Sequence, residues 1–208
     1  MARLNVPATK INLIRIREEL KLAREGYELL EQKRQVLVME VMRLIDTLRK
    51  EGAEAKRLLS EAYGALRRAE VEAGEANVRR AGLSAANVLD ITIRERSVMG
   101  LIVPVVDTAE AQFRPSYSLA DTTSAVDEAA KAFHDALQHI AKLGEIENAA
   151  LLLATELKKT QRRVNALNSV FIPQYQETVK FLQETLEERD RDALFALKRL
   201  KSKAAGKG

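Results

Sequence analysis

The 208-residue chain contains no cysteine and no tryptophan, and only 4% of its residues are aromatic. The lack of cysteine excludes disulfide bonds, thiolate metal sites and a cysteine nucleophile, and it favours a reducing compartment. So few aromatic side chains are typical of long helices, not of a thick globular core. Because there are only four prolines and nine glycines, we expect few turns and few elements.

Long apolar runs are also missing. No stretch approaches the ~18 consecutive apolar residues that a membrane span needs, and residues 1–24 carry charges every few positions, unlike a signal peptide. The chain has no glycine-rich phosphate loop either, since its one Gly-Lys pair is Gly206–Lys207. We therefore expect a soluble, cytoplasmic protein that does not insert into a membrane and binds no nucleotide or other cofactor.

Candidate catalytic and metal-binding residues are scarce. The two histidines, His134 and His139, are five residues apart, which places them on different sides of a helix without an obvious third ligand. The carboxylates follow the rhythm of exposed helix surfaces, and this pattern builds no pocket. We predict that the chain holds no metal and is not itself an enzyme.

Two apolar heptad ladders are the strongest positive signal. The first comprises Leu13, Ile16, Leu20, Ala23, Tyr27, Leu30, Arg34, Leu37, Val41, Leu44 and Leu48, with Arg34 as its misfit. The second comprises Ile146, Ala150, Leu153, Leu157, Thr160, Val164, Leu167 and Phe171. Such spacing keeps one seam of a helix facing a partner helix over many turns. Because both ladders lie in one chain, we predict an all-α fold in which N- and C-terminal helices form a long antiparallel coiled coil.

Aligning the two chain ends predicts a register for this pairing. It brings Leu13 near Leu200, Leu48 near Val164 and Ala62 near Ala150, so that two alanine-rich segments face each other. From Leu167 to Val179, three successive spacings of four residues surround Pro173. We expect the heptad register to shift there and the helix to bend or loosen.

The middle of the chain breaks the heptad pattern. The first helix should continue to about Ala81 and stop at Gly82. Residues 88–106 alternate apolar and polar and then become β-branched, which predicts a β-hairpin turning near Arg96–Val98. Ser124 marks the next helix start. The predicted segments are an N-terminal coiled-coil helix (1–51), its Ala/Gly-rich continuation (52–86), a hairpin (87–107), a loop (108–123), an Ala-rich helix (124–150), a C-terminal coiled-coil helix (151–203) and a disordered tail (204–208).

The net charge is +4, and the basic residues gather near the chain ends. Residues 1–17 and residues 198–208 contain lysine and arginine but no acid, whereas acids outnumber bases over residues 53–150. In an aligned hairpin both ends lie at one basic tip. Such polarity suggests that the two ends of the coil meet different surroundings.

Two other function classes remain open on these grounds. A basic scaffold at a membrane surface should spread its basic residues along one concave face. A nucleic-acid-binding coiled coil should interleave aromatic residues with charge, and the basic run 158–167 contains none. The simplest interpretation of this basic run is a solvated helix face. Neither alternative explains the hairpin or the opposed alanine-rich segments.

Several stretches resemble the D subunit, the central rotor shaft, of the vacuolar/archaeal-type rotary ATPases, over nearly the whole chain. They include Asn5-Val6-Pro7-Ala8-Thr9-Lys10, Gly26 to Arg34, the hairpin stretch Glu95 to Pro104, Leu186-Glu187-Glu188-Arg189 and, most specifically, Lys159-Thr160-Gln161-Arg162-Arg163-Val164-Asn165-Ala166-Leu167 followed by Ile172-Pro173. The resemblance implies a non-catalytic central stalk that transmits torque between a nucleotide-binding ring and the membrane rotor, peripheral to the membrane.

The resemblance also implies partners, with no nucleic acid among them. These are a ring of alternating catalytic and non-catalytic nucleotide-binding subunits, the small F subunit of the rotor and a funnel-shaped subunit linking to the membrane ring. The residues expected to contact the catalytic ring are Arg3, Lys10, Arg162, Arg163, Lys198, Arg199, Lys201 and Lys203. The residues expected to modulate activity through the hairpin are Ile91, Ile93, Met99, Gly100 and Pro104. The residues expected to dock rotor partners are Ala62, Ala65, Ala69, Ala132 and Ala136.

Overall fold

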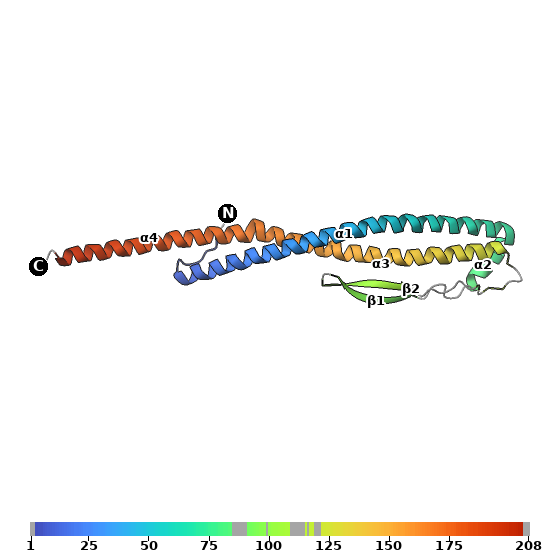
Figure 1. Cartoon of the computed structure of the whole chain (residues 1–208), viewed down its shortest axis with the longest axis horizontal. Helices are drawn as coiled ribbons and strands as arrows, with labels where there is room; N and C mark the ends of the chain where they lie inside the picture. The colour runs from blue at the N-terminus through green and yellow to red at the C-terminus, as the bar shows by residue number, and fades with distance from the viewer. Residues whose placement is uncertain are drawn as a thin grey trace. The chain divides into compact units, whose positions relative to one another are not determined.

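The computed structural model describes residues 3–84, 91–98, 100–108, 115, 117–118 and 122–205 (Figure 1). Its elements are α1 (Lys10–Ala73), α2 (Glu75–Ser84), β1 (Ile91–Val98), β2 (Leu101–Thr108), α3 (Ser124–Ala166), the π-helical turn η2 (Leu167–Phe171) and α4 (Ile172–Ala205). The chain divides into two compact units. The first unit comprises Met1–Val36 with Leu157–Gly208, and the second comprises Leu37–Glu156.

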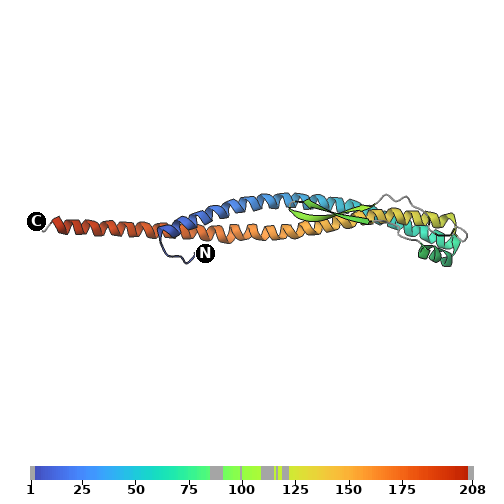
Figure 2. The same ribbon diagram turned by 90° about the horizontal axis from the view of Figure 1, so that it is seen from below.

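In the first unit, α1 and α4 lie side by side and run in opposite directions (Figure 1 and Figure 2). The seam between the helices buries Ile16, Thr160, Val164, Thr178 and Leu182. Ile16 belongs to the first predicted ladder, and Thr160 and Val164 belong to the second. The antiparallel pairing of N- and C-terminal helices is therefore confirmed.

The predicted register of this pairing is wrong. The Nζ atom of Lys10 lies 3.6 Å from a carboxylate oxygen of Asp190, and the backbone N–H of Leu4 donates to Oγ1 of Thr178 at 3.0 Å. Leu200, expected beside Leu13, is 65% exposed. A heptad ladder fixes the spacing of contacts along each helix but not how far one helix slides past the other. The end of α4 consequently extends past the start of α1.

The helix changes its winding just before Pro173. Residues Leu167–Phe171 form the π-helical turn η2 between α3 and α4, which confirms the expected local disruption of the helix. Proline has no backbone N–H and its ring clashes with the carbonyl four residues earlier. A wider turn relieves that clash and inserts the extra residue that shifts the heptad register.

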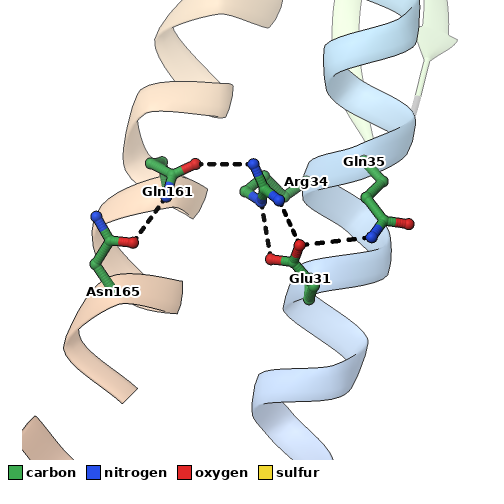
Figure 3. A network of polar contacts seen from close by, with 5 residues as sticks. All are labelled: Glu31, Arg34, Gln35, Gln161 and Asn165. Carbon is green, nitrogen blue, oxygen red and sulfur yellow. Dashed lines mark hydrogen bonds and ion pairs between the residues drawn. The ribbon is translucent and has the colours of Figure 1, made fainter. Parts of the chain in front are cut away.

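Arg34, the misfit of the first ladder, anchors a polar layer within the seam (Figure 3). Its guanidinium donates to both carboxylate oxygens of Glu31, with Nε 2.8 Å from Oε2, and reaches across to Oε1 of Gln161 at 3.3 Å. The amide of Gln161 donates in turn to Asn165 at 2.7 Å. Only 29% of the Arg34 side chain is exposed, and its hydrogen bond and charge lower the pKa of Glu31.

In the second unit, α3 packs against the later part of α1 through small residues. Ala62, Ala65, Ala69, Ala129 and Ala136 are buried, which lets the two helix backbones approach closely. The two alanine-rich segments thus do face each other, but not with Ala62 opposite Ala150. The rings of Tyr63 and Phe133 meet edge to face with centroids 5.4 Å apart, which fixes the observed register.

The first helix ends at Ala73, so the predicted stop at Gly82 is wrong. Gly74 adopts a φ of +83°, a left-handed conformation that glycine accepts without steric cost. The short helix α2 follows, and Ala81 packs with Ala65, Ala69 and Val126 in the apolar cluster of this unit. No helix in the described part of the chain is long and apolar enough to cross a membrane.

The predicted β-hairpin is confirmed, but its turn lies slightly later in the chain than expected. Strands β1 and β2 pair antiparallel with Val98 opposite Leu101, which leaves a two-residue turn instead of one near Arg96–Val98. Gly100 supplies the positive φ of 79° that such turns require. Met99 lies outside the described residues.

The remaining boundaries follow the sequence with small differences. Helix α3 begins at Ser124 as predicted, whereas strand β2 extends to Thr108 and α4 includes residues 204 and 205. The predicted loop 108–123 lies largely outside the described residues, as do residues 206–208.

In the described part of that loop, the hydroxyl of Tyr117 donates a hydrogen bond to the carboxylate of Asp127 at 2.5 Å. Burial together with this bond raises the pKa of Tyr117.

The register can be tested by cross-linking, because the native chain has no cysteine. We expect the double variant K10C/D190C to be joined efficiently by a short bis-maleimide, since these side chains meet in the first unit. The variant L13C/L200C, which follows the aligned-ends register, should not be joined. Efficient linkage of the second pair with failure of the first would contradict the observed pairing.

The polar layer predicts a specific pH dependence of stability. Arg34 lowers the pKa of Glu31 below its ordinary value of 4.5, so this pair stabilises the folded state above that pH and its contribution is lost as the pH falls through the folded pKa. The difference in unfolding free energy between the native chain and R34Q should therefore be largest near neutral pH and narrow in acid. Urea unfolding at several pH values measures it.

The matched control for this experiment is R43Q. The Arg43 side chain is 72% exposed beside Glu40, and exposed ion pairs contribute little to stability. We expect R43Q to follow the native chain at each pH. A loss of stability in R34Q that stays constant from neutral to acid pH would mean that the ion pair with Glu31 does not stabilise the fold.

Candidate functional site

The C-terminal segment of α4, residues 193–202, forms the most distinctive surface of the first unit. Every residue in it is exposed, and Phe195 retains 63% of its accessible surface. Its uncovered large apolar side chains are Leu194, Phe195, Leu197 and Leu200. Its basic side chains are Lys198, Arg199 and Lys201. No acid occurs after Asp192, so apolar and positive groups cover this segment together.

The basic residues predicted to share one tip do not lie together. The guanidinium of Arg3 stacks over the ring of Phe181, 3.8 Å from its centroid, and Lys10 lies beside Asp190. Both positions precede the C-terminal segment along α4. The aligned-ends expectation is wrong here because α4 continues past the N-terminal residues, and the C-terminal segment alone carries the basic end.

Arg162 and Arg163, which are also expected to contact a ring, occupy exposed helix positions. Arg162 and Arg163 lie on the exposed surface of α3 in the first unit, as the interpretation of a solvated basic face predicted. Lys203 belongs to the last turns of α4. The side chain of Lys203 lies outside the described residues, whereas Arg162 and Arg163 are accessible to a partner.

Strand β2 packs against its own unit, whereas strand β1 is mostly exposed. Val103 is 3% exposed, and the backbone N–H of Val106 donates to a carboxylate oxygen of Glu145 on α3 at 2.9 Å. Ile91 and Ile93 are exposed on the opposite face, as is Ile102. The predicted site residue Pro104 lies on this face opposite Glu95.

An ion pair joins the two strands on the face that carries Val103. Arg94 of β1 donates to the carboxylate of Asp107 on β2. The hydrogen bond and the charge of Arg94 lower the pKa of Asp107, and those of Asp107 raise the pKa of Arg94. Both groups are therefore charged at neutral pH, and the pair adds a side-chain contact to the backbone pairing of the hairpin.

The alanines predicted to dock a rotor partner are mostly core residues. Ala62, Ala65, Ala69 and Ala136 are buried against the chain's own helices, and Ala132 is half-buried. The buried methyl groups cannot form a partner surface in this structure. Alanine enrichment identified the close helix contact correctly, but it indicates packing between α1 and α3 and not an open docking face.

Sequence reasoning missed a set of exposed apolar residues outside the inward ladders. On α1 of the first unit these are Ile11, Ile14, Leu22 and Leu29. On α3 of the second unit they are Leu137, Ile140, Leu151 and Leu152. The seven-residue spacing of Leu22 and Leu29 was a detectable signal, because it lies on the helix face opposite the inward ladder.

The two histidines make separate side-chain contacts. The ring of His139 lies 3.6 Å from the carboxylate of Glu51, which also contacts Lys142 at 3.3 Å, and His134 is buried beside Gln138. Within the described ranges, no group of three or more histidine, aspartate or glutamate side chains could hold a metal ion.

Many known proteins are similar to this chain over more than nine-tenths of its length. The family model for the D subunit of ATP synthase matches residues 12–202. The V-type ATP synthase D subunit of Thermotoga neapolitana is 39% identical over 97% of this chain and 100% of its own length. The A-type ATP synthase D subunits of Methanobrevibacter smithii and Pyrococcus furiosus are 37% and 35% identical, over 93% and 96% of this chain and 85% and 94% of their own lengths. The chain belongs to the family of ATP synthase D subunits.

Proposed function

We propose that this chain is the central-stalk rotor subunit of a V/A-type ATPase/synthase, and that it transmits torque between a nucleotide-binding ring and the membrane rotor. The observation that carries the proposal is the C-terminal segment of α4, where the large apolar side chains of Leu194, Phe195, Leu197 and Leu200 remain 59–65% exposed. An uncovered apolar surface that continues a well-packed coil is typical of a protein interface.

The chemistry of the C-terminal segment suits insertion into a ring of subunits. Burial of one large apolar side chain contributes about 1.5–3 kcal/mol, so several together can hold the helix end in an apolar bore. The neighbouring basic side chains favour a bore of opposite charge and speed the encounter by electrostatic steering. The ring we propose alternates catalytic and non-catalytic nucleotide-binding subunits.

Torque transmission follows from the cross-section of a helix pair. Two helices side by side are not circularly symmetric, so rotation presents a different surface to each surrounding subunit in turn. Contact that differs between the open and closed forms of a nucleotide site shifts the equilibrium between them. In this scheme ATP chemistry belongs to the ring, and the chain itself is non-catalytic and needs no cofactor.

The second unit is proposed to meet the other rotor partners, the small F subunit and the funnel-shaped subunit, on the cytoplasmic side of the membrane. Because Ala62 and Ala136 are buried, we move the docking role from the alanines to exposed apolar neighbours such as Leu137 and Ile140. The alanines then act indirectly, by setting the spacing of the two helices. We further propose that the hairpin modulates activity and is not required for insertion into the ring.

Removal of charge from the C-terminal segment tests the steering role. The triple variant K198Q/R199Q/K201Q should join the ring subunits more slowly than the native chain, by on the order of tenfold at low salt. The defect should shrink as salt rises, because salt already screens the attraction in the native chain. Association of purified chain with ring subunits, followed by fluorescence at several salt concentrations, measures it.

The variant K56Q/R67Q/R79Q is the matched control, since it removes three exposed positive charges from the second unit. It should associate with the ring at the native rate. If both triple variants slow association equally, net charge and not the C-terminal segment governs the encounter. If neither triple variant slows association with the ring, the basic C-terminal segment plays no part in assembly.

A further inference from the structure

We propose that strand β1 is a docking edge, to which an extended segment of another subunit of the same complex adds as a third strand. The segment would place apolar residues over the face formed by Ile91 and Ile93, and an acidic residue beside Arg96. The proposal rests on the function proposed above, because that function supplies the neighbouring subunit.

The pairing register shows which backbone groups of β1 point away from the hairpin. In an antiparallel pair, hydrogen-bonded and non-hydrogen-bonded residue pairs alternate. Val106 donates its N–H to Glu145 outside the hairpin, so its pair with Ile93 is non-hydrogen-bonded. Pro104, which has no N–H, sits two residues away opposite Glu95, in the same class. The backbone groups of Ile93, Glu95 and Ser97 therefore face outward.

The two outer edges of the hairpin have different surroundings. The outer edge of β2 lies beside α3, where Glu145 accepts the outward N–H of Val106. Figure 1 shows β1 on the side of the hairpin away from α3. All eight residues of β1 are exposed or half-exposed. An edge strand with unpaired backbone groups is a template for another extended chain.

Residues of β1 whose backbone N–H and C=O groups point outward also carry exposed apolar side chains. Ile93 is 67% exposed, and Ile91 and Ile102 are also open on this face. A strand added to β1 would therefore gain backbone hydrogen bonds and cover apolar side chains together. This combination distinguishes β1 from an edge that is merely solvated, where polar side chains would cover both faces.

Charge defines the sequence of the added segment. On the apolar face Glu95 disfavours an acid in the partner strand. On the other face Arg94 already pairs with Asp107, while Arg96 is exposed and makes no ion pair with any residue that the structure describes. Opposite charges across neighbouring strands stabilise a sheet and like charges destabilise it. The fitting partner is a strand that alternates apolar residues with an acid placed beside Arg96.

Residue-resolved hydrogen exchange of the full chain, free and in the assembled complex, tests this proposal. In the free chain, the amides of Ile93, Glu95 and Ser97 should exchange fast, whereas those of Arg94 and Arg96 are protected by pairing with β2. On assembly the three outward amides should slow by about tenfold or more. The alternation along one strand separates strand addition from general burial, which would slow both sets.

Two variants at position 93 distinguish the contribution of the backbone N–H to binding of the added strand from that of the side chain. I93P removes the outward N–H at a site where the hairpin itself needs no donor, as Pro104 does on β2. I93A keeps the N–H and removes most of the apolar side chain. In the complex, I93P should abolish the added protection of Glu95, whereas I93A should only reduce it. Retained protection of Arg94 and Arg96 shows that the hairpin is intact in each variant.

Three other experimental outcomes would contradict either this proposal or the function on which it rests. Unchanged exchange of the three outward amides in a complex that contains the chain would overturn the proposal. Protection that appears in the isolated chain and grows with its concentration would assign the edge to a second copy, which also overturns it. Failure of the native chain to co-assemble with ring and rotor subunits would contradict the proposed function, and with it the source of the partner strand.

Discussion

The apolar seam between two antiparallel helices of one chain is the constraint on which the rest of the structure depends. A helix as long as α1 gains most of its stability from packing along an amphipathic face and little from intrinsic propensity. The partner for that face comes from the other end of the same chain, through Val164 and Leu182 in the first unit and Leu153 in the second. The seam thus couples segments that are far apart in sequence.

Apolar contacts alone allow one helix to slide past the other by a heptad, and the polar layer opposes this. The guanidinium of Arg34 keeps Glu31 of its own helix in any register, but it reaches Gln161 on the partner helix only in the observed one, and a half-buried polar group that loses a partner is destabilised. In the second unit, close contact between alanines and the Tyr63–Phe133 pair has the same effect. Under the proposed function, a fixed register would let the stalk transmit rotation without slipping.

The sequence predicted the elements better than their relative positions. Both ladders, the helix start at Ser124, the disruption near Pro173 and the hairpin could be identified, because each leaves a local pattern. The register could not, since the contact of Lys10 with Asp190 depends on how far α4 slides past α1. The stop at Gly74 was missed because three nearby glycines look alike in sequence, and only Gly74 adopts a positive φ within the helical region.

For the candidate surfaces, too, the local character could be predicted from the sequence but the position in the fold could not. The basic character of the C-terminal segment could be identified from sequence, but the exposure of Phe195 could not, because it required the observed register. Alanine enrichment predicted a docking face, whereas most of these alanines are buried against the chain's own helices. The sequence does not say whether a small residue faces its own partner helix or another chain. Membership in the family of ATP synthase D subunits lends no support to the membrane-scaffold and nucleic-acid interpretations.

The central claim is that the C-terminal segment of α4 contacts the nucleotide-binding ring. A photo-reactive phenylalanine analogue at position 195, in the intact purified complex, tests it most directly, with the same analogue at Leu83 of the second unit as the control. Irradiation should join position 195 to ring subunits and should not join position 83 to them. Adducts of position 195 with membrane-side subunits alone, or efficient ring adducts from position 83, would contradict the account.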